Sequence, residues 1–350
     1  MTRRGMTLAA SGVLAAVLAI VGLAMPVPYV LLKPGPTFNT LGEFGNKPLI
    51  GISGHAQYPT GGHLDLTTVS VIGGQDNRVS LFDALRGWLD DTTAVVPEEL
   101  IFPPDTKPDE VQQQNADDMR ESQDHARVAA LRYLNIPVTT ELVVSSTAAG
   151  SPADNVGLTR GDVITQVDGE TVTSAQQLRG LIGRHKVGEA VSVTFVRNGR
   201  TATVKPITIQ STDKPLRPII GVTPAERPNL PFEVTIGLKD VGGPSAGLMF
   251  ALGIVDKLTP DELTNGQYVA GTGTIDDDGT VGPIGGIQQK IAAARAKGAT
   301  VFMTPAADCA EAAAARPNGL KLVRVSTLSE AVASLQKLAS HQKVTECTAS

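Results

Sequence analysis

One serine in the C-terminal third of the chain stands where a nucleophile could be activated. The letters GGPSAG at residues 242–247 precede an apolar helix predicted from Leu248 to Leu258, so Ser245 lies where a glycine-rich loop enters a buried helix. Backbone amides without helical partners point outward at such an end, and the helix dipole favours negative charge there. An alkoxide or a tetrahedral oxyanion would be stabilised at this place. A serine that only caps its helix is the alternative, and this segment alone does not decide between them.

A lysine stands 45 positions later, near the start of a second predicted helix. A hairpin predicted within residues 269–286 leads into this helix, which runs from Ile287 to Lys297. Lys290 lies in its first turns, where the dipole disfavours the ammonium form, and burial would lower the pKa of Lys290 further. A neutral lysine can act as a general base, which a serine needs to become a nucleophile near neutral pH. The alternative is an ordinary surface lysine.

Together these two segments resemble the Lon-type serine protease domain. Pro-Ser-Ala-Gly at 244–247 matches the nucleophile motif of that family, and Pro-Ile-Gly-Gly at 283–286, followed by Lys290, matches its lysine motif. The resemblance covers roughly residues 220–340. It implies an α+β fold in which Ser245 and Lys290 form a catalytic dyad that works through an acyl-enzyme. It further implies supporting roles for four residues around the dyad, namely Thr272, Gly243, Pro244 and Ala246.

The chain departs from the family pattern in two respects. Many members carry an aspartate directly before the Gly-Pro-Ser, where this chain has Gly242, and Asp240 lies two residues further upstream, so a tuning role for an acid is left open. Most Lon proteases also carry an ATPase module, but no G-x-x-x-x-G-K-[ST] loop occurs in these 350 residues. The expected activity is therefore ATP-independent cleavage of unfolded or extended membrane-associated or secreted proteins.

Residues 135–209 resemble a bacterial PDZ domain, a module that binds extended peptides beside a sheet edge and a helix. The matching letters are GSPADNVGLTRGDVITQVDG at 150–169, a helix capped by Ser174, and VSVTFVRNGR at 191–200. The nearest match to the family's carboxylate-binding loop begins at Tyr133 and has an asparagine in place of the glycine, so capture of a peptide carboxylate is left open. Ordinary core packing is the alternative role for the leucines on the helix. The candidate peptide-binding residues are Leu134, Asn135, Ile136, Gln177, Leu178 and Leu181.

The first 33 residues are predicted to form a membrane anchor. The 28 residues between Arg4 and Lys33 carry no charge, and this run is longer than the ~20 apolar residues that a spanning helix needs. Arg3 and Arg4 precede this run and only Lys33 follows closely, so the positive-inside rule places the N-terminus in the cytoplasm and the remainder outside. A cleaved signal peptide, which has a shorter apolar region, is the alternative. The prediction is a single-pass plasma-membrane protein with extracytoplasmic PDZ and catalytic domains.

Composition and the remaining motifs narrow the choice of function. The chain has 41% hydrophobic and 19% charged residues, a composition that excludes global disorder and a polytopic membrane protein. Its net charge of −5 does not suggest nucleic acid as a partner. Asp276–Asp278 lacks the glycine and glutamate of a calcium loop, and no zinc-site spacing occurs, so neither a metal nor a cofactor is expected. Cys309 and Cys347 are the two cysteines, and a disulfide between them is left open. A Ser-His-Asp triad is disfavoured because none of the five histidines stands in a motif, namely His55, His63, His125, His185 and His341.

The sequence thus predicts a multidomain chain with an N-terminal transmembrane helix, a PDZ-like β-rich domain with two helices, and an α+β Lon-type proteolytic domain. The expected partners are protein or peptide substrates and the membrane, and a homo-oligomer is left open because many Lon-type domains form rings. The alternative function is a membrane-tethered PDZ scaffold whose protease domain is inactive. The predicted segments are an anchor at 1–33, an N-terminal segment packed on the protease domain at 34–123, the PDZ domain at 124–210, the Lon-type domain at 211–340 and a flexible tail at 341–350.

Overall fold

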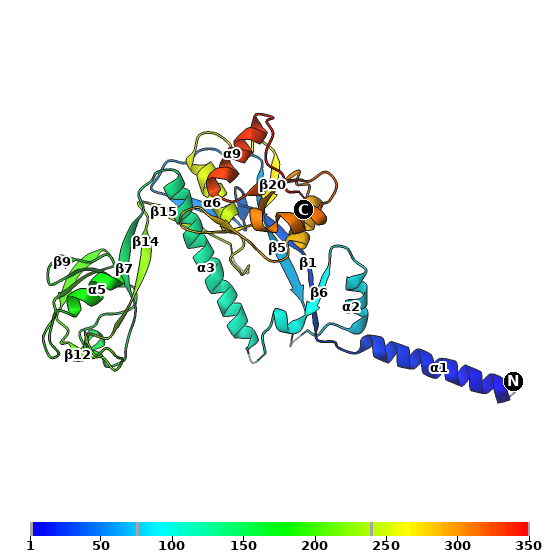
Figure 1. Cartoon of the computed structure of the whole chain (residues 1–350), viewed down its shortest axis with the longest axis horizontal. Coiled ribbons are helices and arrows are strands. Elements are labelled where there is room, and N and C mark those ends of the chain that lie inside the picture. The colour runs from blue at the N-terminus through cyan, green and yellow to red at the C-terminus, as the bar shows by residue number, and fades with distance from the viewer. Residues whose placement is uncertain (1–2, 75–76, 105, 239–240, 349–350) are drawn as a thin grey trace. The chain divides into compact units, whose positions relative to one another are not determined.

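The computed structural model describes residues 3–74, 77–104, 106–238 and 241–348, and the side chains from Ala10 onward (Figure 1). The chain divides into two compact units. One unit is discontinuous and comprises Met1–Ile136 and Phe232–Ser350, and the other, an inserted unit, comprises Pro137–Pro231. The candidate dyad belongs to the discontinuous unit.

A six-stranded mixed sheet forms the centre of the discontinuous unit, in the order β20-β19-β16-β5-β1-β6. The strands β5, β16, β19 and β20 pair in parallel, whereas β1 is antiparallel to both β5 and β6. All five residues of β19 are buried, as expected for a parallel strand with both faces covered. The sheet therefore joins residues from both ends of the chain. Its strands are β1 (Tyr29–Asn39), β5 (His63–Ile72), β6 (Ala94–Pro97), β16 (Tyr268–Gly271), β19 (Val301–Pro305) and β20 (Lys321–Val325).

Helices cover this sheet and hold the candidate site. Every residue of α6 is buried, including Asp256 and Lys257 in its last turn, and the rest of its sequence is apolar on all sides. Helix α6 packs on α3, α9 and β5. Helix α7 packs against β1 and β5. The helices are α1 (Arg3–Ala24), α2 (Leu81–Trp88), α3 (Pro108–Tyr133), α6 (Gly247–Leu258), α7 (Ile287–Ala296), α8 (Cys309–Ala314) and α9 (Leu328–Ala339), with 3₁₀ turns η1 (Glu98–Leu100) and η2 (Ala306–Asp308). Short strand pairs complete the unit: β2 (Glu43–Phe44) with β3 (Lys47–Pro48), β4 (Ile50–Ser53) with β15 (Glu233–Ile236), and β17 (Thr274–Ile275) with β18 (Val281–Gly282).

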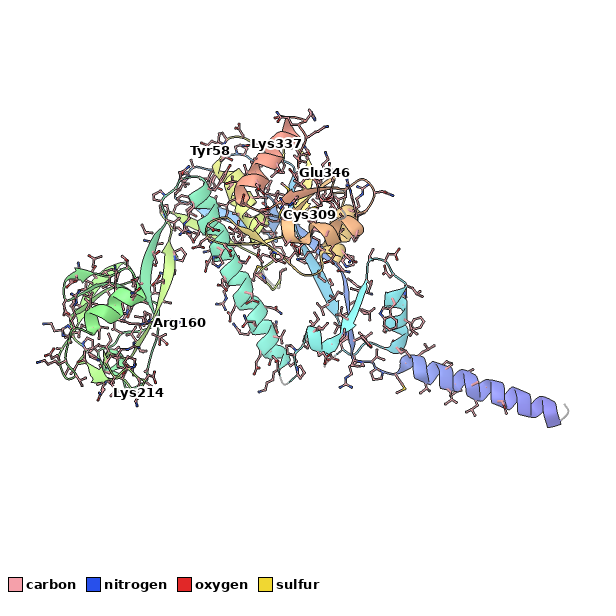
Figure 2. All side chains as sticks on the ribbon, in the orientation of Figure 1. Tyr58, Arg160, Lys214, Cys309, Lys337 and Glu346 are labelled. Atoms are coloured by element: carbon pink, nitrogen blue, oxygen red, sulfur yellow. A yellow bond between two sulfur atoms is a disulfide. The ribbon has the colours of Figure 1, made fainter. Side chains whose placement is uncertain are left out.

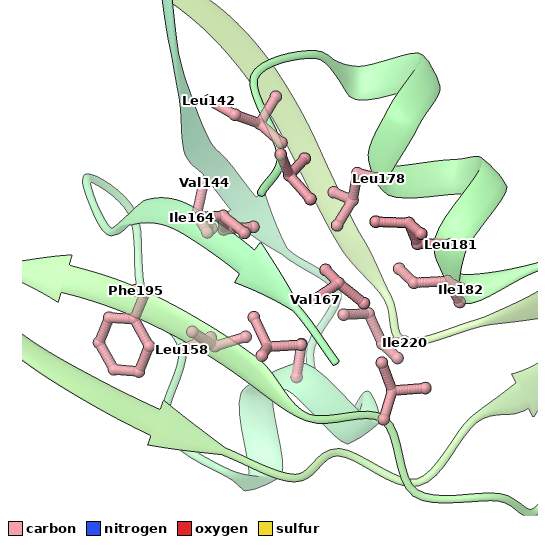
Figure 3. Close-up of a cluster of buried hydrophobic side chains, with 14 residues drawn as sticks. Leu142, Val144, Leu158, Ile164, Val167, Leu178, Leu181, Ile182, Phe195 and Ile220 are labelled. Atoms are coloured by element: carbon pink, nitrogen blue, oxygen red, sulfur yellow. The ribbon is translucent and has the colours of Figure 1, made fainter. Parts of the chain in front are cut away.

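The inserted unit has its own sheet and its own core (Figure 3). Its strand order is β11-β10-β8-β7-β14, with β9 paired to β8. The predicted Ser174 cap is confirmed, because its hydroxyl accepts a hydrogen bond from the Gln177 amide at 3.2 Å, and the predicted hairpin turn at Asn198-Gly199 is confirmed by positive φ angles at both residues. The elements are β7 (Thr139–Thr147), α4 (Pro152–Asn155), β8 (Val163–Val167), β9 (Glu170–Thr171), α5 (Ala175–Ile182), β10 (Val193–Arg197), β11 (Arg200–Val204), β12 (Ile209–Gln210), β13 (Pro218–Ile219) and β14 (Val222–Asn229).

The prediction of a membrane-spanning helix within residues 1–33 is wrong. Over the described ranges, no helix combines the length and the apolar character that crossing a membrane requires. Helix α1 ends at Ala24, and the later part of the uncharged run enters strand β1 at Tyr29, so the run does not form one helix. The predicted plasma-membrane localisation and the membrane partner depended on that helix and are corrected with it.

A disulfide joins the two cysteines and fastens the C-terminal segment. Cys309 begins α8 (Figure 2) and is bonded to Cys347, with their Cα atoms 5.0 Å apart. The Cys347 amide donates to the Leu322 carbonyl at 2.9 Å, so the segment lies along β20. The bond and this pairing hold the end of the described chain on the sheet.

Reduction of this disulfide is expected to lower the free energy of unfolding by about 3–4 kcal/mol, because a 38-residue loop regains its conformational freedom in the unfolded chain. Urea denaturation with and without reductant measures the change. The Cys347→Ala variant is the control and should not respond to reductant. Equal stability of the oxidised and reduced chains would contradict the expectation.

Candidate active site

Helix α3 positions the loop that carries Ser245. The Ser122 hydroxyl on α3 donates to the Pro244 carbonyl at 2.8 Å, and the Gly243 amide donates to the Asn115 carbonyl at 2.9 Å. Gly243 has a φ of +84°, a left-handed conformation that glycine adopts at little cost. The supporting glycine and proline named from the sequence therefore attach the loop to α3. No sequence motif indicates Ser122, because its partner lies 122 positions away.

Gly242 occupies the position where many Lon-type domains carry an aspartate. A Cβ atom added here would lie 2.6 Å from the Asn115 Cβ, which is closer than side-chain carbons approach. The loop therefore lies against α3 without room for an aspartate at this position. Asp240, the upstream alternative, is outside the described residues.

Backbone amides surround Ser245 at the start of α6. The Leu248 amide donates to the Gly273 carbonyl at 3.1 Å, whereas the amides of Ser245, Ala246 and Gly247 have no acceptor within the described residues. These amides lie at the positive end of the helix dipole. The arrangement can donate hydrogen bonds to an oxyanion that forms at Ser245.

Lys290 is buried in the first turn of α7, with 3% of its surface exposed. Its Nζ donates to the Thr272 Oγ1 at 3.1 Å. Burial lowers the pKa of Lys290 from 10.5 to about 8, and the negative charge of Asp308 acts in the opposite direction. A lysine with this pKa is partly neutral near pH 7–8 and can accept a proton.

Thr272 connects the serine loop to the lysine. It is fully buried, and its hydroxyl accepts from Lys290 and donates to the Ser245 carbonyl at 2.9 Å. The adjacent Gly273 amide donates to the same carbonyl, also at 2.9 Å. One hydroxyl therefore both orients the amine and helps to hold the backbone of the serine.

Ser245 and Lys290 line one cavity of about 480 Å³. The cavity wall also includes residues 66–70 of β5, Met119 of α3 and Gly285, and none of the described residues that line it is a histidine. Within the described part of the chain the Ser245 Oγ makes no hydrogen bond, and the partner of the Lys290 Nζ is the Thr272 Oγ1 instead. The structure thus brings the two predicted residues to a shared space.

The six candidate peptide-binding residues divide between the two units. Leu134, Asn135 and Ile136 follow the C-terminal end of α3 in the discontinuous unit, and Asn135 has a φ of +57°. Gln177, Leu178 and Leu181 lie on α5 in the inserted unit. The two leucines are buried in the core of that unit (Figure 3), and the Gln177 side chain accepts a hydrogen bond from the Thr173 amide at 2.9 Å.

A different segment lies beside α5 in the inserted unit. Leu178 and Ile182 of α5 and residues 217–224 line a cavity of about 340 Å³. This segment contains Ile-Gly-Val at 220–222, an aliphatic-glycine-aliphatic pattern like that of a carboxylate-binding loop, and leads into β14, which is at the edge of the sheet. The pattern is visible in the sequence, but it stands at the C-terminal end of the domain rather than at the N-terminal end.

Two protein-family profiles match the chain. The profile of the PDZ domain matches residues 112–207, and that of the Lon protease (S16) C-terminal proteolytic domain matches residues 230–337. The chain therefore combines a PDZ domain with a Lon-type proteolytic domain, and the prediction of these two domains is confirmed.

Several known proteins each resemble a part of the chain. The "Serine protease Do-like HtrA" of Lactococcus lactis subsp. cremoris is 44% identical over 66 residues, which are 19% of this chain and 16% of that protein. The "Lon protease" of Rhizobium meliloti is 30% identical over 186 residues, which are 51% of this chain and 22% of that protein. The solved PDZ domain of the SdrC-like protein from Listeria monocytogenes is 30% identical, with a TM-score of 0.22. This match covers 24% of this chain and 86% of the solved domain. The chain thus spans about a fifth or less of the length of these two curated relatives.

Proposed function

We propose that the chain is a serine endopeptidase in which Ser245 is the nucleophile and Lys290 the general base. The observation that carries this proposal is that Ser245 and Lys290 line one cavity, while the fully buried Thr272 hydroxyl links the lysine amine to the serine backbone. The neutral amine takes the proton of the Ser245 hydroxyl as its oxygen attacks the scissile carbonyl carbon. The resulting ammonium then gives that proton to the leaving amine, and water hydrolyses the acyl-enzyme.

Amides at the start of α6 would stabilise the oxyanion of each tetrahedral intermediate. Those of Ser245 and Ala246 are adjacent to the nucleophile and have no acceptor within the described residues. Preorganised donors of this kind contribute roughly 10²–10³ in rate each. Gly243, Pro244 and Ala246 thus support catalysis through the backbone rather than through their side chains.

Extended polypeptides are the proposed substrates. Strand β16 pairs with β5 only as far as Leu66, so the same edge of residues 67–72 has no partner strand in the described structure. Residues 67–70 line the cavity beside Ser245, where an extended chain can add as a strand. These 350 residues contain no nucleotide-binding P-loop, so cleavage should need no ATP. The inserted PDZ domain would recognise peptides at α5 and the 217–224 segment or regulate access.

The pH profile tests the identity of the base. Only the neutral form of Lys290 can accept the serine proton, so kcat/KM should rise through pH 8 and level off about one unit above it. Cleavage of an unstructured fluorogenic polypeptide without nucleotide measures the profile. A limb near pH 6–7 that disappears on replacement of a histidine would contradict the lysine assignment and support a histidine base. Absence of cleavage at every pH would support a peptide-binding scaffold.

Thr272→Val is expected to lower kcat/KM by about tenfold to a hundredfold, because the lysine amine and the Ser245 carbonyl each lose a hydrogen bond, together about 1.5–3 kcal/mol. The same fluorogenic assay measures the loss. Thr264→Val is the matched control, since Thr264 is also buried but its hydroxyl bonds to the Gly61 carbonyl, away from the residues that line the cavity. An unchanged kcat/KM in Thr272→Val would contradict the role.

A further inference from the structure

We propose that Asp308 is a positioning residue for Lys290, whose carboxylate anchors the loop ahead of α7 and places a fixed negative charge near the amine. The proposal rests on the proposed role of Lys290 as general base. No sequence motif singles out Asp308, which lies 18 positions beyond the lysine. It acts through Lys290 and is not among the residues that line the cavity.

The geometry attaches Asp308 to the lysine motif. Asp308 is the last residue of η2, directly after β19, and only 8% of its surface is exposed. Its Oδ2 accepts a hydrogen bond from the Ile284 amide at 3.1 Å. Ile284 belongs to the Pro-Ile-Gly-Gly segment that leads into α7, and the next residue, Gly285, lines the cavity. The carboxylate thus holds the backbone from which the lysine helix begins.

The charge of Asp308 opposes the effect of burial on Lys290. Burial lowers the pKa of the lysine, and the Asp308 carboxylate raises it. In return, the pKa of Asp308 is raised by burial and by Glu311 and lowered by the Ile284 amide and by Lys290. Other charged or titratable groups lie on the elements packed against α7, but none of them is among the causes of the lowered pKa of Lys290. They are Tyr29 and Lys33 on β1, His63 and Asp65 on β5, Tyr268 on β16 and Glu311 on α8.

This arrangement matches the needs of a base that becomes a cation. When Lys290 accepts the serine proton, an ammonium forms inside a buried site, where it is poorly solvated. A carboxylate held nearby stabilises that ammonium without itself accepting the proton. Asp308 would therefore strengthen Lys290 as a base, and it would also keep the amine protonated up to a higher pH in the free enzyme.

Asp308→Asn separates the charge from the hydrogen bond, because the amide oxygen can still accept from Ile284. The acidic limb of kcat/KM should move to lower pH by about half a unit or more. At pH 7 the rate should rise several-fold, with a ceiling of about tenfold, since only about a tenth of a lysine with a pKa of about 8 is neutral there. The plateau at high pH should fall, because the base is weaker. Structural damage alone would not raise the rate at pH 7.

Two further variants complete the test. Asp308→Glu keeps the negative charge, so the acidic limb of its kcat/KM profile should lie near the pH at which the wild-type limb lies. Glu311→Gln removes an exposed carboxylate three positions away, whose partner is Gln288, and should leave the limb in place. The proposal is overturned if Asp308→Asn leaves the limb unchanged, or if Glu311→Gln shifts it equally.

A measurement that does not need activity distinguishes this proposal from the proposed function. NMR of full-length protein labelled at its lysines follows the titration of the Lys290 amine, which is assigned by its absence in Lys290→Met. Asp308→Asn should move this titration to lower pH. If Asp308→Asn shifts the Lys290 titration but the wild type cleaves no polypeptide, the charge coupling is supported and the endopeptidase assignment is overturned. Cleavage by the wild type with an unmoved titration would overturn the role of Asp308 alone.

Discussion

Ser245→Ala should lower the rate of polypeptide cleavage by a factor on the order of 10⁴–10⁶, because no other group in the cavity would supply the attacking oxygen at the same place. The Ser245 hydroxyl makes no hydrogen bond within the described residues, and its carbonyl, which Thr272 and Gly273 hold, is retained in the variant. The free energy of unfolding should therefore change by less than about 1 kcal/mol. Cleavage of an unstructured polypeptide and urea denaturation measure the two effects.

Ser334 offers a control outside the cavity. It is a largely buried serine on α9 that is not among the residues that line the cavity. Ser334→Ala should keep kcat/KM within a few-fold of the wild type. Equal activity of the wild type and Ser245→Ala would refute the nucleophile assignment and favour a peptide-binding scaffold or an unrelated contaminating peptidase.

Lys290→Met is expected to lower the same activity by orders of magnitude and to stabilise the fold at neutral pH. Loss of a general base costs roughly 10²–10⁴ in rate. The pKa of Lys290 falls from 10.5 in the unfolded chain to about 8 in the folded one, so protonated Lys290 destabilises the fold by about 3 kcal/mol. Methionine has a similar length and no charge to bury.

The pH dependence of this stabilisation has a definite sign. Between pH 8 and 10.5 the unfolded state binds more protons at Lys290 than the folded state, so the wild type gains stability as pH rises through this window. The advantage of Lys290→Met should thus be full below pH 8 and decrease toward pH 10.5. Urea denaturation at pH 7 and at pH 10 measures it, and Lys297→Met, at the exposed C-terminal end of α7, is the control. A variant less stable than the wild type at pH 7 would contradict the buried-amine argument.

Local sequence signals identified the parts of this protein that depend on near neighbours. The loop at 242–247 and the helix after it indicated Ser245, and the glycine-rich segment at 283–286 indicated the helix of Lys290. Cap and turn chemistry likewise predicted the Ser174 cap and the hairpin at 198–199. Each of these features depends on residues within a few positions of one another, which is why its pattern can be read directly.

The absence of charge in the N-terminal run did not predict its secondary structure. The run between Arg4 and Lys33 has no charge, yet it is shared between α1 and β1. A strand buried in a sheet and a helix in a membrane can both be apolar, and composition does not separate them. The strand form follows from pairing with β5 and β6, whose residues lie far along the chain.

The sequence itself determined which residues could supply a nucleophile and a base, because turn and helix signals are local. The tertiary structure alone determined the hydrogen bonds around them: those of Ser122 with the serine loop, of Thr272 with Ser245 and Lys290, and of Asp308 with the segment ahead of α7. These hydrogen bonds join residues that lie between 18 and 122 positions apart. Such long-range contacts form only when the chain packs around one core, so no short stretch of sequence predicts them.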